Sequence, residues 1–189
     1  PERIAALEPR AKNYTHRDIA DERLDYWLKP EREAEINFDI RFGWTAAPYF
    51  INSYRSGESE VVDELHRQGI AVGFFFFERA AAVSPEAAEA LDRTIIADFR
   101  GMLSETAPGA ASVVGEAFSE RRCYVEVMLW DSDRVFEAVQ NWSSQASNVR
   151  AAAFRSYRRP AGILFFKSAD RSKNASDAGD IADEADEVS

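Results

Sequence analysis

Cysteine and histidine are almost missing from this chain of 189 residues, because Cys123 is the one cysteine and His16 and His66 are the two histidines. A single cysteine excludes an internal disulfide and a cysteine-rich zinc site, and it favours a reducing compartment such as the cytoplasm. Neither histidine has another His, Cys, Asp or Glu four residues away, the spacing at which two ligands on one helix share a metal ion. We therefore expect no metal ion and no other cofactor.

Glycine-rich loops and long apolar runs are also lacking. Gly57, Gly69 and Gly73 match neither the phosphate-binding loop of nucleotide hydrolases nor the dinucleotide-binding fingerprint. No uncharged apolar run approaches the roughly 20 residues of a membrane helix, and residues 1–10 lack the apolar stretch of a signal peptide. We expect a soluble protein that neither inserts into a membrane nor uses a nucleotide.

Positive charge is scarce, since 23 Lys and Arg residues stand against 33 Asp and Glu residues, for a net charge of −10. Residues 169–189 contain seven of these acids and only two bases, with almost no large apolar side chain. That composition predicts a flexible acidic tail. The rest of the chain is mildly acidic, which argues against nonspecific binding to nucleic acid, because such binding depends on neutralising phosphates.

Aromatic residues are abundant, at 12% of the chain with 13 phenylalanines. Residues 70–77 form an apolar run that ends in four consecutive phenylalanines. Successive side chains of a strand point to opposite faces, so this run predicts a central strand that is covered on both faces. We expect this strand to anchor the fold.

Upstream of this run, the spacing of apolar residues predicts several elements. Residues 15–28 have helical spacing, whereas residues 36–44 alternate between apolar and polar and predict a strand. Residues 48–57 read as a loop, and residues 59–69 as a helix between a serine cap and a glycine stop. A strand, a helix and a strand in close succession predict that the two strands run parallel.

Downstream, the pattern predicts a long helix, a hairpin, a second helix and two final strands. The long helix begins at Ser84 and Pro85, which are a typical N-cap and first helical residue. The other predicted elements are strands at 111–118 and 122–130, a helix after Asp131, and strands at 149–157 and 162–167.

Together these elements predict an α+β fold with a mixed sheet, helices packed on one side of it, and ferredoxin-like sandwich character. We divide the chain into an N-terminal helical segment at 1–30, an α+β domain at 31–168 and the acidic flexible tail at 169–189.

Three charged residues on the predicted strands are candidates for catalysis. Asp39 and Glu126 fall on the polar faces of two strands that we expect to share a sheet, and Arg41 lies two residues after Asp39. A carboxylate pair in a sheet-lined pocket titrates anomalously and can act as acid and base, beside an arginine that holds an anion. The alternative is that these are ordinary solvated side chains on a half-covered sheet.

A basic segment without an intervening acid lies between residues 150 and 167, and aromatic residues are interspersed in it. Arginine beside exposed aromatic rings can bind phosphate and stack on bases. The alternatives are an ordinary cationic sheet edge, or a patch that the acidic tail covers. The candidate anion ligands are Arg150, Arg155, Arg158, Arg159 and Lys167.

No motif points to a reaction, so three functions stay open. The first hypothesis is a non-catalytic cytoplasmic regulator, inhibitor or assembly component that binds another macromolecule, above all a protein, through an acidic and aromatic surface that suits a basic partner. The second is a small enzyme that uses Asp39, Arg41 and Glu126. The third is a nucleic-acid or phosphate binder that uses the basic segment. The sequence indicates no oligomeric state.

Overall fold

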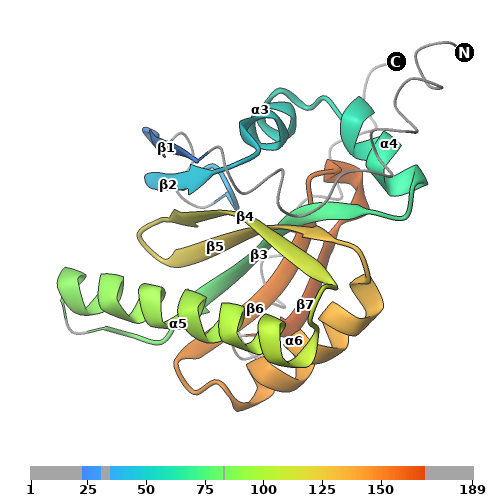
Figure 1. The fold of residues 1–189 in the computed structure, drawn as a ribbon. Coiled ribbons are helices and arrows are strands. Elements are labelled where there is room, and N and C mark those ends of the chain that lie inside the picture. Colours follow the sequence, from blue (N-terminus) through green and yellow to red (C-terminus); the bar gives the residue numbers. More distant parts are fainter. Residues whose placement is uncertain (1–22, 31–34, 83, 169–189) are drawn as a thin grey trace, which may run out of the picture.

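The computed structural model describes residues 23–30, 35–82 and 84–168 (Figure 1). Seven strands, four helices and one short 3₁₀ helix lie within these ranges. Their order is β1 (Leu24–Trp27), β2 (Phe42–Thr45), α3 (Pro48–Ser56), α4 (Glu60–Arg67), β3 (Ala71–Arg79), α5 (Pro85–Thr106), β4 (Ala111–Phe118), β5 (Arg122–Leu129), α6 (Ser132–Gln145), β6 (Val149–Ser156), η1 (Arg159–Ala161) and β7 (Ile163–Lys167). The fold is α+β, as the sequence predicts.

All seven strands belong to one sheet, in the order β1-β2-β4-β5-β3-β6-β7. Every pair of neighbouring strands is antiparallel, so the predicted mixed sheet is wrong. The parallel pair expected from residues 36–44 and 70–77 is wrong as well. β2 pairs with β1 and β4, whereas β3 pairs with β5 and β6, because the β4–β5 hairpin is inserted between them.

Helices cover both faces of the sheet, which corrects the prediction of helices on one side (Figure 1). α5 and α6 pack on one face, where Ile95, Phe99 and Val139 join the rings of Phe75 and Phe77. We call this the α5 face. α3 and α4 pack on the other face, the α3 face, where a second buried cluster of side chains is built around the tyrosines and phenylalanines of β3, β5 and α3.

The phenylalanine run is confirmed as a central strand covered on both faces. β3 has β5 on one side and β6 on the other. Phe75 and Phe77 point to the α5 face, while Phe74 and Phe76 point to the α3 face, and all four rings are buried. Each buried ring contributes roughly 1.5 to 3 kcal/mol of hydrophobic stabilisation, so β3 stabilises the cores on both faces of the sheet.

The region before β3 differs most from the prediction. Residues 24–27 form the edge strand β1 and not part of a helix, and they belong to the sheet rather than to a separate segment. The other residues of the predicted helix at 15–22, and the acidic tail at 169–189, lie outside the described residues. Residues 35–39 form a turn, so only Phe42–Thr45 of the predicted strand is a strand. The predicted loop at 48–57 is helix α3.

The elements after β3 follow the prediction closely. The Ser84 hydroxyl accepts a hydrogen bond from the Ala87 amide and caps α5, and Pro85 is its first residue. The Asp131 carboxylate accepts from the Arg134 amide in the same way and caps α6. The hairpin β4–β5 and the strands β6 and β7 are also confirmed. Of the helices described, none combines the length and the apolar character needed to cross a membrane.

Candidate functional site

An open groove of about 1050 Å³ lies at the end of the sheet where β3 ends and α5 begins. The β4–β5 turn reaches the same end of the molecule (Figure 1). The groove is lined by the start of β2, the end of β3 and the loop after it, the first two turns of α5, the β4–β5 turn, and Arg150 at the start of β6. We call it the end groove.

The apolar part of the end groove is built on two stacked rings. Phe42 of β2 and Phe118 of β4 are cross-strand partners whose ring centroids lie 5.0 Å apart at an angle of 18°. Small residues of the loop after β3 and of α5, such as Pro85 and Ala88, also line the groove. Trp27 is the partner of Phe42 on the far side and is 79% exposed, so the aromatic row continues out of the groove to the sheet edge.

The rim of the end groove carries charges of both signs. The Arg41 guanidinium donates to the Glu120 carboxylate at 2.8 Å, and both side chains are largely exposed. The Arg79 guanidinium donates to both oxygens of Asp92, at 3.0 and 3.3 Å. The exposed side chain of Arg121 has no ion-pair partner among the residues that the structure describes. Its guanidinium is therefore available to an incoming anion.

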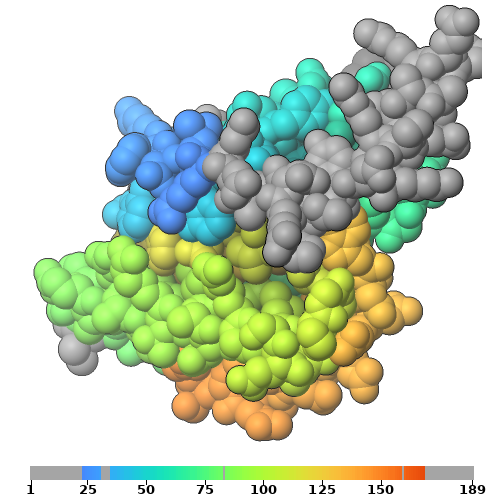
Figure 2. Space-filling model, in the orientation of Figure 1, coloured from blue at the N-terminus to red at the C-terminus, as the bar shows by residue number. Residues whose placement is uncertain are grey.

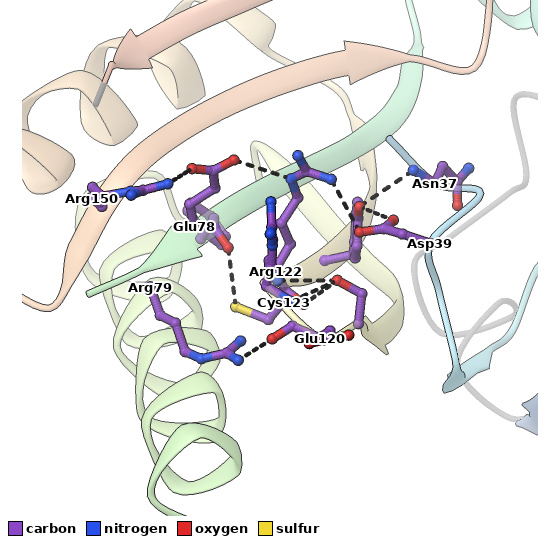
Figure 3. A network of polar contacts seen from close by, with 12 residues as sticks. Asn37, Asp39, Glu78, Arg79, Glu120, Arg122, Cys123 and Arg150 are labelled. Carbon is purple, nitrogen blue, oxygen red and sulfur yellow. Dashed lines mark hydrogen bonds and ion pairs between the residues drawn. The ribbon is translucent and has the colours of Figure 1, made fainter. Parts of the chain in front are cut away.

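Behind the rim, a chain of ion pairs crosses the sheet (Figure 3). The buried carboxylate of Asp39 accepts from Arg122 at 3.1 Å and from the Tyr124 hydroxyl. Arg122 also donates to Glu78 at 3.3 Å, and Glu78 accepts from Arg150 at 2.7 Å. Burial opposes ionisation of Glu78, but its two arginine partners outweigh burial and lower its pKa. This chain ties the turn at 35–39 to β5, β3 and β6.

Asp92 is the one acid of the end groove that is deeply buried, at 3% exposure. Burial raises the pKa of Asp92 to about 6, although Arg79 acts to lower it. The thiol of Cys123 lies beside this carboxyl and is fully buried, and burial raises its pKa well above the ordinary value. Cys123 thus packs as a buried thiol in the core on the α5 face.

Glu126 lies elsewhere, in the middle of the α3 face. One row of paired residues crosses the sheet there, from Thr45 through Gly115, Glu126 and Phe74 to Arg155. The Glu126 carboxyl accepts from the Thr45 hydroxyl at 2.8 Å and from the Tyr26 hydroxyl at 3.4 Å, and the Tyr157 hydroxyl lies close to it. Burial raises the pKa of Glu126 to about 8 despite these hydrogen bonds. At neutral pH this side chain is therefore mainly the uncharged acid.

Glycine makes room for this buried acid. A β-carbon on Gly115 would stand 2.4 Å from Glu126 Oε2, and one on Gly43 would stand 2.8 Å from the Tyr26 hydroxyl. These are distances that real β-carbons do not adopt. The two glycines leave a hollow in the sheet, and the carboxyl of Glu126 and the phenol of Tyr26 fill it.

Gly115→Ala is expected to lower the free energy of unfolding by roughly 1 to 3 kcal/mol, because the new methyl group overpacks the hollow against Glu126 and the Trp44 carbonyl. Gly101→Ala is the matched control. Apart from the backbone of α5 itself and the adjacent residues, no heavy atom of the described residues lies within 4 Å of a β-carbon on Gly101, so this change should raise stability by about 0.5 to 1 kcal/mol. Urea unfolding of both variants measures the contrast, and equal effects would contradict this account of the hollow.

The structure does not bring the three predicted catalytic residues together. Asp39 and Glu126 are both buried, so they are not ordinary solvated side chains. Their carboxylates have different hydrogen-bond partners. Arg41 points to Glu120 in the rim of the end groove. Asp39 also lies in a turn and not on a strand, because the chain bends at Asn37, which has a φ of 71°.

The structure does not bring the predicted anion ligands to one surface either. Arg150 pairs with Glu78, Arg158 pairs with Asp63 of α4 at 2.7 Å, and Lys167 donates to the Ala146 carbonyl at 2.7 Å. Arg155 is half-buried on the α3 face, with its guanidinium 5.6 Å from the centre of the Tyr54 ring. The side chain of Arg159 lies outside what the structure describes.

Sequence reasoning missed Arg122, Tyr26 and Thr45, which hold the two buried acids. A signal for one of these acids was present, because Glu126 is the only charged residue between Cys123 and Leu129 of an otherwise apolar strand. A charge in such a run indicates a buried acid with dedicated hydrogen-bond partners. The partners themselves depend on which strands are neighbours, and local sequence patterns do not carry that information.

Comparison with models of protein families, with curated proteins and with solved structures found no match. Within the described ranges, no group of three or more His, Cys, Asp or Glu side chains could hold a metal ion.

Proposed function

We propose that this protein binds another protein without catalysis, by holding a segment of that partner in the end groove. The observation that carries this proposal is the anatomy of the groove, in which stacked aromatic rings are surrounded by charges of both signs. Protein interfaces have this arrangement, with an apolar centre inside a polar rim and with aromatic residues and arginine enriched.

The chemistry of the rim defines the partner segment. Arg121, which has no ion-pair partner in the described part of the chain, offers its guanidinium to an acidic side chain. Guanidinium groups bind carboxylates well because two donors engage two oxygens. Phe42, which is half-buried and stacks on the buried ring of Phe118, offers an apolar surface for a large side chain. The segment that fits is therefore extended, carries an aromatic or aliphatic anchor, and has an acidic residue near that anchor.

Selection of peptides from a random library displayed on phage, with the full chain as bait, tests this proposal. The selected peptides should carry an acid beside an apolar anchor, and Arg121→Glu should weaken their binding at least tenfold by replacing attraction with repulsion. Arg67→Glu is the matched control, because Arg67 is 68% exposed on α4 on the opposite face of the sheet. Failure to enrich peptides, or equal binding to both variants, contradicts the proposal.

A small enzyme is the second candidate, and Asp92 is the observation that favours it. A carboxyl in a groove with a pKa of about 6 can exchange protons near neutral pH, and Arg79 beside it can hold an anion. The set Asp39, Arg41 and Glu126 has less support, because these residues do not face one another. Binding of nucleic acid through residues 150–167 also has less support, since Arg150 and Arg158 are engaged in ion pairs.

We also propose ferredoxin-like character for the central part of the fold. The chain order β3-α5-β4-β5-α6-β6 is a strand-helix-strand-strand-helix-strand arrangement. β1, β2 and β7 extend the sheet of this unit at its two edges, and α3 and α4 cover its second face. A cytoplasmic location, proposed from the single buried thiol, agrees with a binding role inside the cell.

A further inference from the structure

The two edges of the sheet differ in how they are protected. At the β7 edge, the Phe166 carbonyl accepts a hydrogen bond from Gln140 of α6 at 3.1 Å, and the Lys167 ammonium donates a hydrogen bond to a carbonyl at the end of α6. The β6–β7 ladder also shifts register between Ala152 and Ala153. Such devices discourage pairing with another strand. At the other edge, β1 has no bulge and receives no hydrogen bond from a described helix.

The backbone of β1 can be oriented from two hydrogen bonds. The Leu28 amide donates to the Arg41 carbonyl at 2.8 Å, and the Ala46 amide donates to the Val114 carbonyl. Because hydrogen-bonded and non-hydrogen-bonded pairs alternate along an antiparallel ladder, Leu24 and Tyr26 bond to β2. The N–H and C=O groups of Asp25 and Trp27 therefore point outward from the sheet edge.

Two side chains of the edge strand β1 are apolar and exposed, whereas its one acid, Asp25, is paired with Arg23 at 3.0 Å. Leu24 is 51% exposed on the α3 face, and Trp27 is 79% exposed on the α5 face. Figure 2 shows the residues of β1 and β2, in blue and cyan, at the surface above α5, in green. Since Trp27, Phe42 and Phe118 form one cross-strand row, this edge is continuous with the end groove.

We propose that the partner segment adds to the sheet as an eighth strand along β1, with its side chains on the α5 face directed toward the end groove. This inference rests on the proposed function and specifies how the partner is recognised. A row of outward N–H and C=O groups at strand spacing is complementary to one structure, another extended chain. Backbone pairing supplies affinity, and alternate side chains supply specificity.

A segment of a different protein fits this edge better than a second copy of this chain does. β1 has only four residues, and pairing two such strands buries far less than the roughly 1,200 Å² of a stable interface. A segment that pairs with β1 and continues into the end groove buries more. Its residues opposite Leu24 and Trp27 are apolar, because these two side chains of β1 are exposed.

The test uses the strongest peptide from the phage selection, synthesised with a single N-methyl group at each position in turn. N-methylation removes one backbone donor at a time. Strand addition predicts that affinity for the full chain falls at least tenfold at every second position and changes little at the positions between. Loss at every position, at none, or with a spacing of three to four residues overturns the inference.

Two variants of the protein test the same ladder from the other side. Asp25→Pro removes an outward N–H and is tolerated at an edge strand, whereas Asp25→Ala removes only the carboxylate. Asp25→Pro should weaken peptide binding at least tenfold more than Asp25→Ala, with circular dichroism spectra showing that both variants are folded. Equal peptide binding by the two variants overturns the inference. A wild-type dimer in sedimentation that Asp25→Pro dissociates also overturns it, because β1 would then pair with a second copy of the chain.

The outcomes separate this inference from the proposed function. Peptides that depend on Arg121 but lack the alternating response to N-methylation leave groove binding in place and overturn strand addition. If the selection enriches no peptide, both proposals fail together.

Discussion

Phe75→Ala is expected to lower the free energy of unfolding by roughly 3 to 5 kcal/mol, a large share of the roughly 5 to 15 kcal/mol that holds a typical domain together. The Phe75 side chain is fully buried, and its ring centroid lies 5.0 Å from those of both Phe99 and Phe154. Truncation removes the apolar surface of the ring and leaves a cavity between α5 and the sheet, which rigid neighbours cannot fill.

Chemical denaturation followed by tryptophan fluorescence measures this loss. Phe165→Ala is the matched control, because Phe165 on β7 is 55% exposed and its removal should lower stability by about 1 kcal/mol or less. A loss below about 2 kcal/mol for Phe75→Ala, or equal losses for the two variants, would show that β3 is not the centre of the core.

Much of the fold from β3 onward could be predicted because its signals are local. The run at 70–77 is too apolar to lie anywhere but inside, and Ser84 with Pro85 places the start of α5 correctly. The caps and hairpin turns of the later elements are also encoded within a few residues. Strand order is different, because it depends on contacts between segments far apart in the chain, and so the mixed sheet was a wrong prediction.

The region between residues 35 and 57 shows how local signals mislead. Alternating residues at 36–44 resemble a strand, but the hydrogen bond from the Asn37 amide to the Tyr124 hydroxyl and the ion pair of Asp39 hold the first half as a turn. Pro48 and Gly57 look like loop residues. In the structure Pro48 opens α3 and Gly57, with a φ of 83°, closes it, which are the places where helices accept these residues.

The candidate sites were predictable only in part. The sequence places Asp39 and Glu126 on the polar faces of two predicted strands, and in the structure both are buried in hydrogen-bonded clusters. The burial of these acids depends on α3 and on glycines of neighbouring strands. The local sequence therefore could not distinguish buried acids from acids on a solvent-exposed face of the sheet. The end groove depends on four segments that meet only in the folded chain, and no short motif encodes it.

Glu126→Gln is expected to remove most of the dependence of stability on pH between pH 5 and pH 8. The pKa of Glu126 rises from 4.5 to about 8 in the folded protein, mainly because burial penalises the charged form. The folded state therefore holds a proton that the unfolded state has released. The stability that this proton contributes is fully present below pH 4.5 and is lost as the pH rises toward 8, by about 3 to 4 kcal/mol over this interval.

Urea unfolding at pH 5 and at pH 8 measures the effect. The wild-type protein should lose stability between the two values, with a smaller loss from Asp92, whose pKa is also raised, to about 6. His66 opposes this loss, because burial lowers its pKa and its contribution to stability rises with pH. Glu126→Gln keeps the shape of the uncharged acid and cannot ionise. The free energy of unfolding of this variant, relative to that of the wild type, should therefore rise by about 3 kcal/mol from pH 5 to pH 8. If the free energy of unfolding depends on pH equally in the wild type and in Glu126→Gln, then Glu126 is ionised in the folded protein. The buried carboxylate would then need a cation, which the cluster of Thr45, Tyr26 and Tyr157 does not supply.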